Sequence, residues 1–332
     1  MKALVTGGGG FLGSRMVHML RERGDDVVFV ARGHYPPVEA TGARGLQIDL
    51  RDRDKVRDAV TGCDVVFHVA AKAGYWGPLE EYRGINVDGT RNVIDACEEV
   101  GVGRLVYTST PSVIGYTHDV ANGGPELPYA EQHLSPYPAT KAEAEKMVLA
   151  ANSPQLATTA LRPHLIFGPG DLQLLPRVLQ RARQGRLRIV GNGENRVDFT
   201  YVDNAALAHL DAAAALVGHQ APNAGRAYFI SNGEPVSLWG WVNELLVACD
   251  IPPVTSKISP GVANTVGWLM EKAWSTLPLG GEPPMTRFLA GGFLYDHWYD
   301  LGPATRDFGY TPRVSMAEGT AATVADLRAR GV

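Results

Sequence analysis

The sequence predicts an α/β protein built on a doubly wound parallel sheet, with a smaller substrate domain in its C-terminal half. Three observations support this fold class. Short apolar segments alternate with helical ones from the first residue, and a glycine-rich turn follows the first apolar segment. Proline, glycine and tryptophan gather in the second half. Near-continuous apolar segments separated by helices are typical of parallel strands that are covered on both faces.

The regular elements can be assigned in order along the first half of the chain. Strands are expected at residues 3–5, 26–31, 45–48, 64–69, 104–107 and 157–161. Helices are expected between them at residues 12–23, 52–60 and about 80–100. Right-handed crossovers between such strands give a doubly wound Rossmann fold.

The chain is expected to divide near residue 165. Residues 1–165 should form a dinucleotide-binding domain, and residues 166–332 mainly a substrate-binding domain interleaved with it. The second half is less regular and holds five of the six tryptophans. Residues 262–279 are apolar but interrupted by Glu271 and Lys272, which predicts an amphipathic helix, with contact at a membrane surface as the lesser alternative.

Composition excludes several classes of protein. The formal net charge of -4 argues against a nucleic-acid backbone as the main partner. Cys63, Cys97 and Cys249 show no CxxC spacing, which predicts a reducing compartment, no disulfide framework and no metal site. The first residues resemble a strand and not a signal peptide, and no apolar run is long enough to span a bilayer. We therefore expect a cytoplasmic protein.

The first turn carries glycines at a regular spacing, with two residues between Gly7 and Gly10 and two between Gly10 and Gly13. Glycines allow a tight turn and a close approach of the backbone to phosphate groups. The helix that follows directs the positive end of its dipole at the same point. Because the motif follows a strand and opens a helix, it predicts a dinucleotide site over a merely structural turn.

The end of the second predicted strand distinguishes NAD from NADP. A carboxylate there would bind the ribose 2′-hydroxyl, but the sequence has Arg32 and no acid. An arginine pairs well with a phosphate, so the sequence favours NADP(H), and a solvated surface charge is the alternative. Asp49 and Leu50 follow the third strand and are expected to meet the adenine. Asp49 has a second interpretation as the N-cap of the next helix.

Tyr137 and Lys141 are four residues apart, so a helix places both side chains on one face. A nearby ammonium and an oxidised nicotinamide both favour the phenolate. Moving a tyrosine pKa from about 10 to about 7 requires about 4 kcal/mol of differential stabilisation. Such a tyrosine would exchange a proton with a carbonyl or alcohol oxygen. The alternative is a chance match on an exposed helix face.

A third hydroxyl should hydrogen-bond the substrate oxygen. The candidates Ser109, Thr110 and Ser112 follow the fifth predicted strand, at the edge of the sheet where α/β folds bind their ligands. Some hydroxyls in this segment must instead brace the loop.

Taken together, these motifs resemble the extended short-chain dehydrogenase/reductase family, in its 3β-hydroxysteroid dehydrogenase-like branch. The resemblance covers essentially the whole chain. The matching segments are TGGGGFLG at 6–13, DL at 49–50, HVAAKAG at 68–74, NVDGTRNV at 86–93, YTSTPSV at 107–113, YPATK at 137–141, LRPHLIFGPGD at 161–171 and VDFTYVDNAALAH at 197–209.

The resemblance implies a role for each matching residue. Tyr137 would be the proton donor and Lys141 its partner and a ribose ligand. Thr110 stands where many members have serine, and Ser109 is a possible substitute for it. Asn86 would brace the site. The implied cofactor contacts are Gly7, Gly10, Phe11, Leu12, Gly13, Arg32, Asp49, Leu50, Ala70, Ala71, Lys72, Thr108, Tyr137, Lys141 and Pro163.

Within this branch, residues 34–36, 182–191, 228–235 and 281–290 are similar to bacterial reductases of long-chain olefin biosynthesis. That likeness implies NADPH-dependent reduction of a 2-alkyl-3-oxoalkanoate to the 2-alkyl-3-hydroxyalkanoate. It also implies a homodimer formed through the Tyr137 helix, and possible assembly with a β-lactone synthetase and a β-lactone decarboxylase. Residues 262–298 would supply an apolar surface for the alkyl chains, with Arg287 as a candidate for the carboxylate. The alternatives are a 3β-hydroxysteroid or sterol dehydrogenase and, more remotely, a non-catalytic NADP-sensing or scaffold protein.

Overall fold

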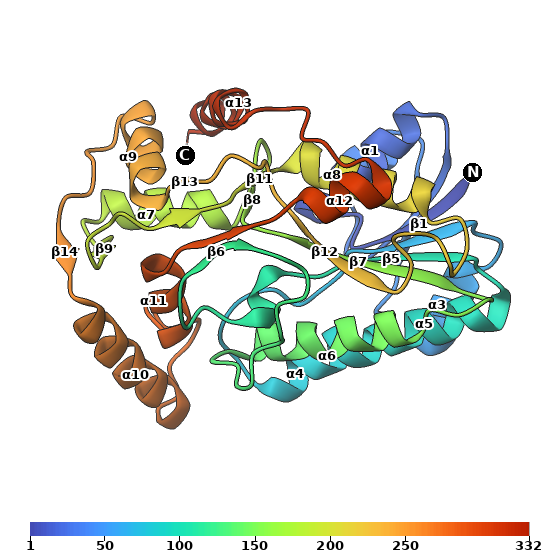
Figure 1. Ribbon diagram of the computed structural model, residues 1–332, viewed down its shortest axis with the longest axis horizontal. Coiled ribbons are helices and arrows are strands. Elements are labelled where there is room, and N and C mark those ends of the chain that lie inside the picture. The colour runs from blue at the N-terminus through green and yellow to red at the C-terminus, as the bar shows by residue number, and fades with distance from the viewer. Residues whose placement is uncertain (332) are drawn as a thin grey trace.

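The computed structural model describes residues 1–331 and confirms the doubly wound fold (Figure 1). Its central layer is a seven-stranded sheet in the order β12-β7-β5-β4-β1-β2-β3, and every neighbouring pair is parallel. The strands are β1 (Lys2–Thr6), β2 (Asp26–Ala31), β3 (Arg44–Gln47), β4 (Val65–His68), β5 (Arg104–Thr108), β7 (Ala157–Pro163) and β12 (Arg226–Ile230). The strand order reverses between β1 and β4, which is where such sheets bind ligands.

Helices cover both faces of this sheet, as Figure 1 shows. One face carries α1 (Phe11–Glu22), α8 (Val202–Ala215) and α12 (Gly302–Phe308). The other carries α3 (Arg53–Val60), α4 (Leu79–Arg83), the π-helix η1 (Gly84–Asp88), α5 (Gly89–Val100) and α6 (Pro136–Ala150). A separate apolar core lies on each side of the sheet. The short helix α2 (Pro36–Glu39) follows β2.

The elements of the first half lie within a few residues of their predicted positions. The predicted helix at 80–100 is one continuous run in which a π-helical turn separates α4 from α5. Strand β12 was not predicted. Its partner β7 lies some 65 residues earlier in the chain, and this pairing completes the edge of the sheet.

The rest of the chain forms smaller sheets and helices around a third core. One sheet has four strands, β6 (Val120–Gly123), β10 (Arg196–Val197), β13 (Val236–Ser237) and β15 (His297–Tyr299). Two-stranded pairs join β8 (Ile166–Phe167) to β11 (Thr200–Tyr201), and β9 (Ile189–Val190) to β14 (Lys257–Ile258). The helices are α7 (Leu174–Arg183), α9 (Leu238–Ala248), α10 (Pro260–Thr276), α11 (Arg287–Leu294) and α13 (Met316–Ala329), with a 3-10 turn η2 (Pro111–Ile114) in the first half.

The chain passes between the two parts more than once. Strand β6 of the first half pairs with β15, whereas β12 and α8 of the second half belong to the large sheet and its covering layer. The division at residue 165 stays a prediction. Helix α10 coincides with the predicted amphipathic helix. Across residues 1–331, no helix combines the length and apolarity that crossing a bilayer requires.

Candidate active site and nucleotide site

The glycine turn after β1 lies so close to neighbouring backbone atoms that no side chain fits at Gly7 or Gly13. Gly7 has φ of +70°, and a Cβ there would lie 2.8 Å from the Cα of Ala70. A Cβ on Gly13 would collide with the carbonyl oxygen of Gly7. Gly10 is the N-cap of α1, and the side chain of Leu12 lies in the core. The backbone N–H groups at this helix terminus can therefore be approached closely, as a pyrophosphate requires.

A buried chain of hydrogen bonds connects Thr6, the last residue before this turn, to the π-helix. Thr6 Oγ1 lies 2.7 Å from His68 Nδ1, and His68 Nε2 lies 2.9 Å from Thr90 Oγ1. Thr90 donates to the carbonyl of Asn86 at 2.6 Å, so it accepts from His68, and His68 in turn accepts from Thr6. Burial lowers the pKa of His68 to about 3, which keeps the ring neutral. The glycine turn is thereby linked to the π-helix.

Asn86 connects three parts of the site. Its Oδ1 accepts from the Lys72 backbone N–H at 2.7 Å, and its Nδ2 donates to the Lys72 carbonyl at 3.2 Å. The same Nδ2 donates to Thr140 Oγ1 on α6 at 3.0 Å. The loop at residues 70–72 is thus fixed between the glycine turn and the helix that bears Tyr137.

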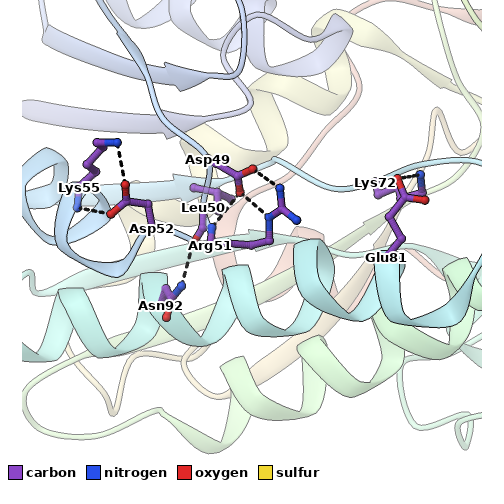
Figure 2. A network of polar contacts seen from close by, with 8 residues as sticks. All are labelled: Asp49, Leu50, Arg51, Asp52, Lys55, Lys72, Glu81 and Asn92. Carbon is purple, nitrogen blue, oxygen red and sulfur yellow. Dashed lines mark hydrogen bonds and ion pairs between the residues drawn. The ribbon is translucent and has the colours of Figure 1, made fainter.

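Figure 2 shows the polar network at the end of β3. Asp49 accepts two hydrogen bonds from the Arg51 side chain, at 2.9 and 2.6 Å, which chiefly lower the pKa of Asp49 to about 2. The N-cap of α3 is Asp52, so the alternative interpretation of Asp49 as that cap is wrong. Lys72 Nζ pairs with Glu81 at 2.6 Å. Arg32, by contrast, is exposed and has no ion pair within residues 1–331.

Tyr137 and Lys141 lie near the start of α6, where Pro136 occupies the first helical position. Lys141 is 2% exposed. Its Nζ donates to the Thr108 carbonyl at 2.6 Å and lies 4.1 Å from the centre of the Tyr107 ring. The Thr108 hydroxyl lies 2.8 Å from His209 Nε2, so the hydroxyl and the carbonyl of Thr108 both bind protein atoms. Thr108 therefore positions Lys141.

The pKa values of the pair move in directions that the sequence did not predict. Burial raises the pKa of Tyr137 to about 12, and the neighbouring Thr110 hydroxyl opposes this rise. Burial also lowers the pKa of Lys141 to about 7, although Glu145 opposes this. The expected fall of the Tyr137 pKa toward 7 is wrong for the groups that the protein itself supplies, because desolvation outweighs them. Tyr137 is consequently protonated at neutral pH, the form that a general acid needs.

The three hydroxyl residues after β5, Ser109, Thr110 and Ser112, have different surroundings. Thr110 caps η2, accepting from the Ser112 backbone at 3.3 Å, and its Oγ1 lies 3.0 Å from Ser112 Oγ. Both residues line one cavity with Tyr137. Ser109 lies outside this lining, and its buried Oγ has no hydrogen-bond partner within residues 1–331.

The cavity extends from this trio into the second half of the molecule. Its volume is about 360 Å³, within the usual range for small-molecule sites. Its wall is mostly apolar and includes Phe199, Trp241 and Val242 from the third core, and Phe288 and Phe293 from α11. Such a wall suits an alkyl chain better than a sugar.

The comparison with protein families agrees with this geometry. Residues 4–257 match the model of the 3-beta hydroxysteroid dehydrogenase/isomerase family. The chain belongs to this family. It is an oxidoreductase of the extended short-chain dehydrogenase/reductase type, a family that depends on a nicotinamide dinucleotide.

Similar proteins are found along the whole chain. A 2-alkyl-3-oxoalkanoate reductase of Stenotrophomonas maltophilia is 55% identical, covering 96% of this chain and 97% of its own. One from Shewanella oneidensis is 45% identical, covering 96% and 84%. The structure of MoeE5 in complex with UDP-glucose and NAD is similar with a TM-score of 0.76 and 27% identity, covering all of both chains.

Two expectations for the substrate half of this dehydrogenase need correction. Helix α10 does not line the cavity, so only part of residues 262–298 supplies its apolar surface. Arg287 binds the buried Glu271 through its Nε and its backbone N–H, both at 2.7 Å, and does not line the cavity either. The carboxylate role suggested for Arg287 is therefore wrong.

Sequence reasoning also missed residues that line the cavity, namely Tyr75, Tyr116, His164, Arg181 and His297. His164 alone had a usable signal, because it directly follows β7 at the edge of the sheet where ligands bind. The others come from loops, α7 and β15, which only the tertiary structure brings together.

Proposed function

We propose that this dehydrogenase reduces a 2-alkyl-3-oxoalkanoate to the 2-alkyl-3-hydroxyalkanoate with NADPH. The observation that carries the proposal is the 55% identity, over nearly the full length of both chains, with a reductase of that name. The apolar cavity that begins at Tyr137 supports it, because the substrate carries two alkyl chains.

The proposed mechanism assigns the proton to the protein. A nicotinamide held beside Tyr137 would supply the hydride for the ketone carbon. Tyr137 donates its phenolic proton to the ketone oxygen, and the Thr110 hydroxyl hydrogen-bonds that oxygen and orients it. Lys141, held by the Thr108 carbonyl, lies one helical turn away and compensates the phenolate that remains. Replacing Tyr137 with phenylalanine should lower kcat by about 1000-fold and leave NADPH binding intact. Unchanged turnover would contradict this role.

We infer that the nucleotide lies along the glycine turn, with its pyrophosphate at the first turn of α1. Gly7, Gly10, Phe11, Leu12 and Gly13 would present their backbones to it. The adenosine would lie beside Asp49, Leu50 and residues 70–72, and the nicotinamide beside Pro163. The exposed, unpaired Arg32 would meet the 2′-phosphate and make NADPH the preferred cofactor.

A second candidate is a 3β-hydroxysteroid dehydrogenase, because the matching family model carries that description. A paired assay separates the two. Purified protein is incubated with a synthetic 2-alkyl-3-oxoalkanoate or a 3-ketosteroid, each with NADPH and with NADH, and nicotinamide absorbance is followed. We expect fastest turnover of the oxo acid with NADPH. Steroid turnover without oxo-acid turnover would refute the proposal, and no turnover of either would favour a non-catalytic NADP-binding role.

We also propose the cellular setting that the resemblance implies. The protein would act in the cytoplasm, in long-chain olefin biosynthesis, and the three cysteines, all free and buried, suit a reducing compartment. It would form a homodimer through α6 and neighbouring helices, and assemble with a β-lactone synthetase and a β-lactone decarboxylase. Light scattering of the purified protein, alone and mixed with those enzymes, tests both statements.

A further inference from the structure

The proposed substrate is an anion, whereas the cavity that would receive it is mostly apolar. The carboxylate is only two bonds from the ketone carbon, so it must lie near Tyr137 when the ketone does. A carboxylate leaves water for such a cavity only if hydrogen-bond donors and a positive charge replace its hydration. One side of the cavity must therefore supply a cation.

Two histidines of the wall are poorly suited to that task. His164 Nδ1 donates to the Asp198 carbonyl at 2.6 Å, and His297 Nε2 donates to the Gly292 carbonyl at 2.8 Å. Their ring centres are 4.8 Å apart, so a charge on one would oppose a charge on the other. Burial lowers the pKa of both. Both rings are accordingly neutral near pH 7.

Two arginines also line the cavity, and they differ in whether a carboxylate pairs with them. Arg177 Nη1 pairs with Glu282 Oε2 at 2.9 Å. The other oxygen of Glu282 accepts from the Tyr75 backbone N–H at 3.2 Å, which holds this carboxylate between two residues that line the cavity. Within residues 1–331, Arg181 has no ion pair, and its side chain makes one hydrogen bond, from Nη2 to Tyr75 Oη at 3.4 Å. Arg181 is thus the cavity-lining cation whose charge no carboxylate neutralises.

Arg181 lies on the side of α7 that faces the cavity. It shares a face of α7 with Leu174 and Val178, which line the same cavity. Its partner Tyr75 is joined to the catalytic helix, because the Tyr75 carbonyl accepts from Ser135 Oγ at 2.9 Å, at the N-cap of α6. Tyr75 therefore connects the Arg181 guanidinium to the turn that bears Tyr137.

We propose that Arg181 binds the carboxylate of the substrate and selects acids over neutral ketones. This inference rests on the proposed function and names the group that recognises its substrate class. The planar guanidinium would pair with both carboxylate oxygens. An alkyl chain would then extend toward Phe199 and Trp241 at the apolar end of the cavity.

The test compares a freshly prepared 2-alkyl-3-oxoalkanoate with its methyl ester, which keeps the ketone and both chains but has no charge. For wild type, Arg181→Met, Arg181→Lys and the control Arg183→Met, kcat/KM is measured for each substrate with NADPH. Arg183 lies on the same helix and is exposed outside this cavity. Arg181→Met should reduce the acid-to-ester ratio by roughly 10- to 100-fold, mainly through KM for the acid. Ester turnover and the Arg183→Met ratio should stay close to wild type, and Arg181→Lys should retain part of the preference.

The outcomes separate this inference from the proposed function. Acid turnover by the wild type with an unchanged ratio in Arg181→Met overturns the carboxylate assignment alone. An equal loss for acid and ester in Arg181→Met also overturns it, because that result indicates a structural role. If the wild type reduces neither substrate, the proposed function fails and the assignment fails with it.

Discussion

At the scale of single residues, the environment of each group decides its chemistry more than its type does. Tyr137 and Lys141 form the expected one-turn pair, yet burial raises the pKa of the phenol and lowers that of the ammonium. Likewise, Ser109 and Thr110 both carry hydroxyls, but only Thr110 faces the cavity. The spacing in the sequence identifies the pair, and the direction of each side chain distinguishes the hydroxyls.

The choice between these hydroxyls is testable. Thr110→Val keeps the side-chain shape and removes the hydroxyl, so kcat should fall by about 100-fold, the usual effect of losing one donor to the reacting oxygen. Thr110→Ser should restore most of the activity. Ser109→Ala is the matched control and should stay close to wild type, because Ser109 does not line the cavity. A larger loss in Ser109→Ala than in Thr110→Val would reverse the assignment.

Cofactor preference is a second residue-scale prediction. Arg32→Glu replaces the proposed phosphate partner with an acid that would repel the 2′-phosphate and accept from a 2′-hydroxyl. The NADPH-to-NADH ratio of kcat/KM should fall by at least about 100-fold, as expected when a charged hydrogen bond becomes a repulsion. Arg91→Glu on α5 changes the net charge equally at an exposed position and serves as control. A ratio that does not respond to Arg32→Glu would remove Arg32 from the site.

At the scale of elements, the π-helical turn η1 has a definite role. It interrupts the regular helix at residues 84–88 and presents Asn86 to both Lys72 and Thr140. Single π-helical turns inside α-helices are frequent at functional sites. Here the turn holds the proposed adenosine loop against the catalytic helix.

Removing that contact should therefore weaken both stability and nucleotide binding. Asn86→Ala deletes three hydrogen bonds in a buried position, so the free energy of unfolding should fall by about 2 kcal/mol. NADPH titration should show weaker binding, because the 70–72 loop loses its anchor. Asn92→Ala, which deletes one half-buried bond to Leu50 from the same helical run, should cost less than about 1 kcal/mol. Equal effects of the two variants on NADPH binding would contradict this role.

At the scale of the whole molecule, buried neutral histidines accept hydrogen bonds that link the central sheet to its surroundings. Burial lowers the pKa of His68 to about 3 and of His209 to about 4, from an ordinary 6.5. Both accept a hydrogen bond from a threonine on the central sheet, which a protonated ring could not do. Asp198 acts in the opposite sense, because burial raises its pKa to about 6.

These shifts predict a loss of stability in acid. The buried His164 and His297, whose pKa values are also lowered, act in the same direction as His68 and His209. Between pH 6 and pH 4 the unfolded chain protonates His68 and His209, which the folded protein keeps largely neutral, so the free energy of unfolding falls as pH falls. Each ring contributes about 1.4 kcal/mol per pH unit, and Asp198 offsets about one of them. Denaturant titrations across this range should show the decline, and His209→Gln should flatten it by about 1.4 kcal/mol per unit. A stability that does not change with pH across this range would contradict the account.

The sequence alone was enough to predict the parallel Rossmann sheet, the glycine turn and the Tyr137–Lys141 pair. Each depends on residues close together in the chain: apolar segments of strand length, a spacing of glycines, and two residues one helical turn apart. It did not place Arg287, strand β12 or the wall of the cavity. Those depend on contacts between residues far apart in the chain, such as Glu271 with Arg287, β12 with β7, and α7 with Tyr75. Which arginine is neutralised and which faces the cavity is known only from the folded chain, because the pairing of charges depends on neighbours in space.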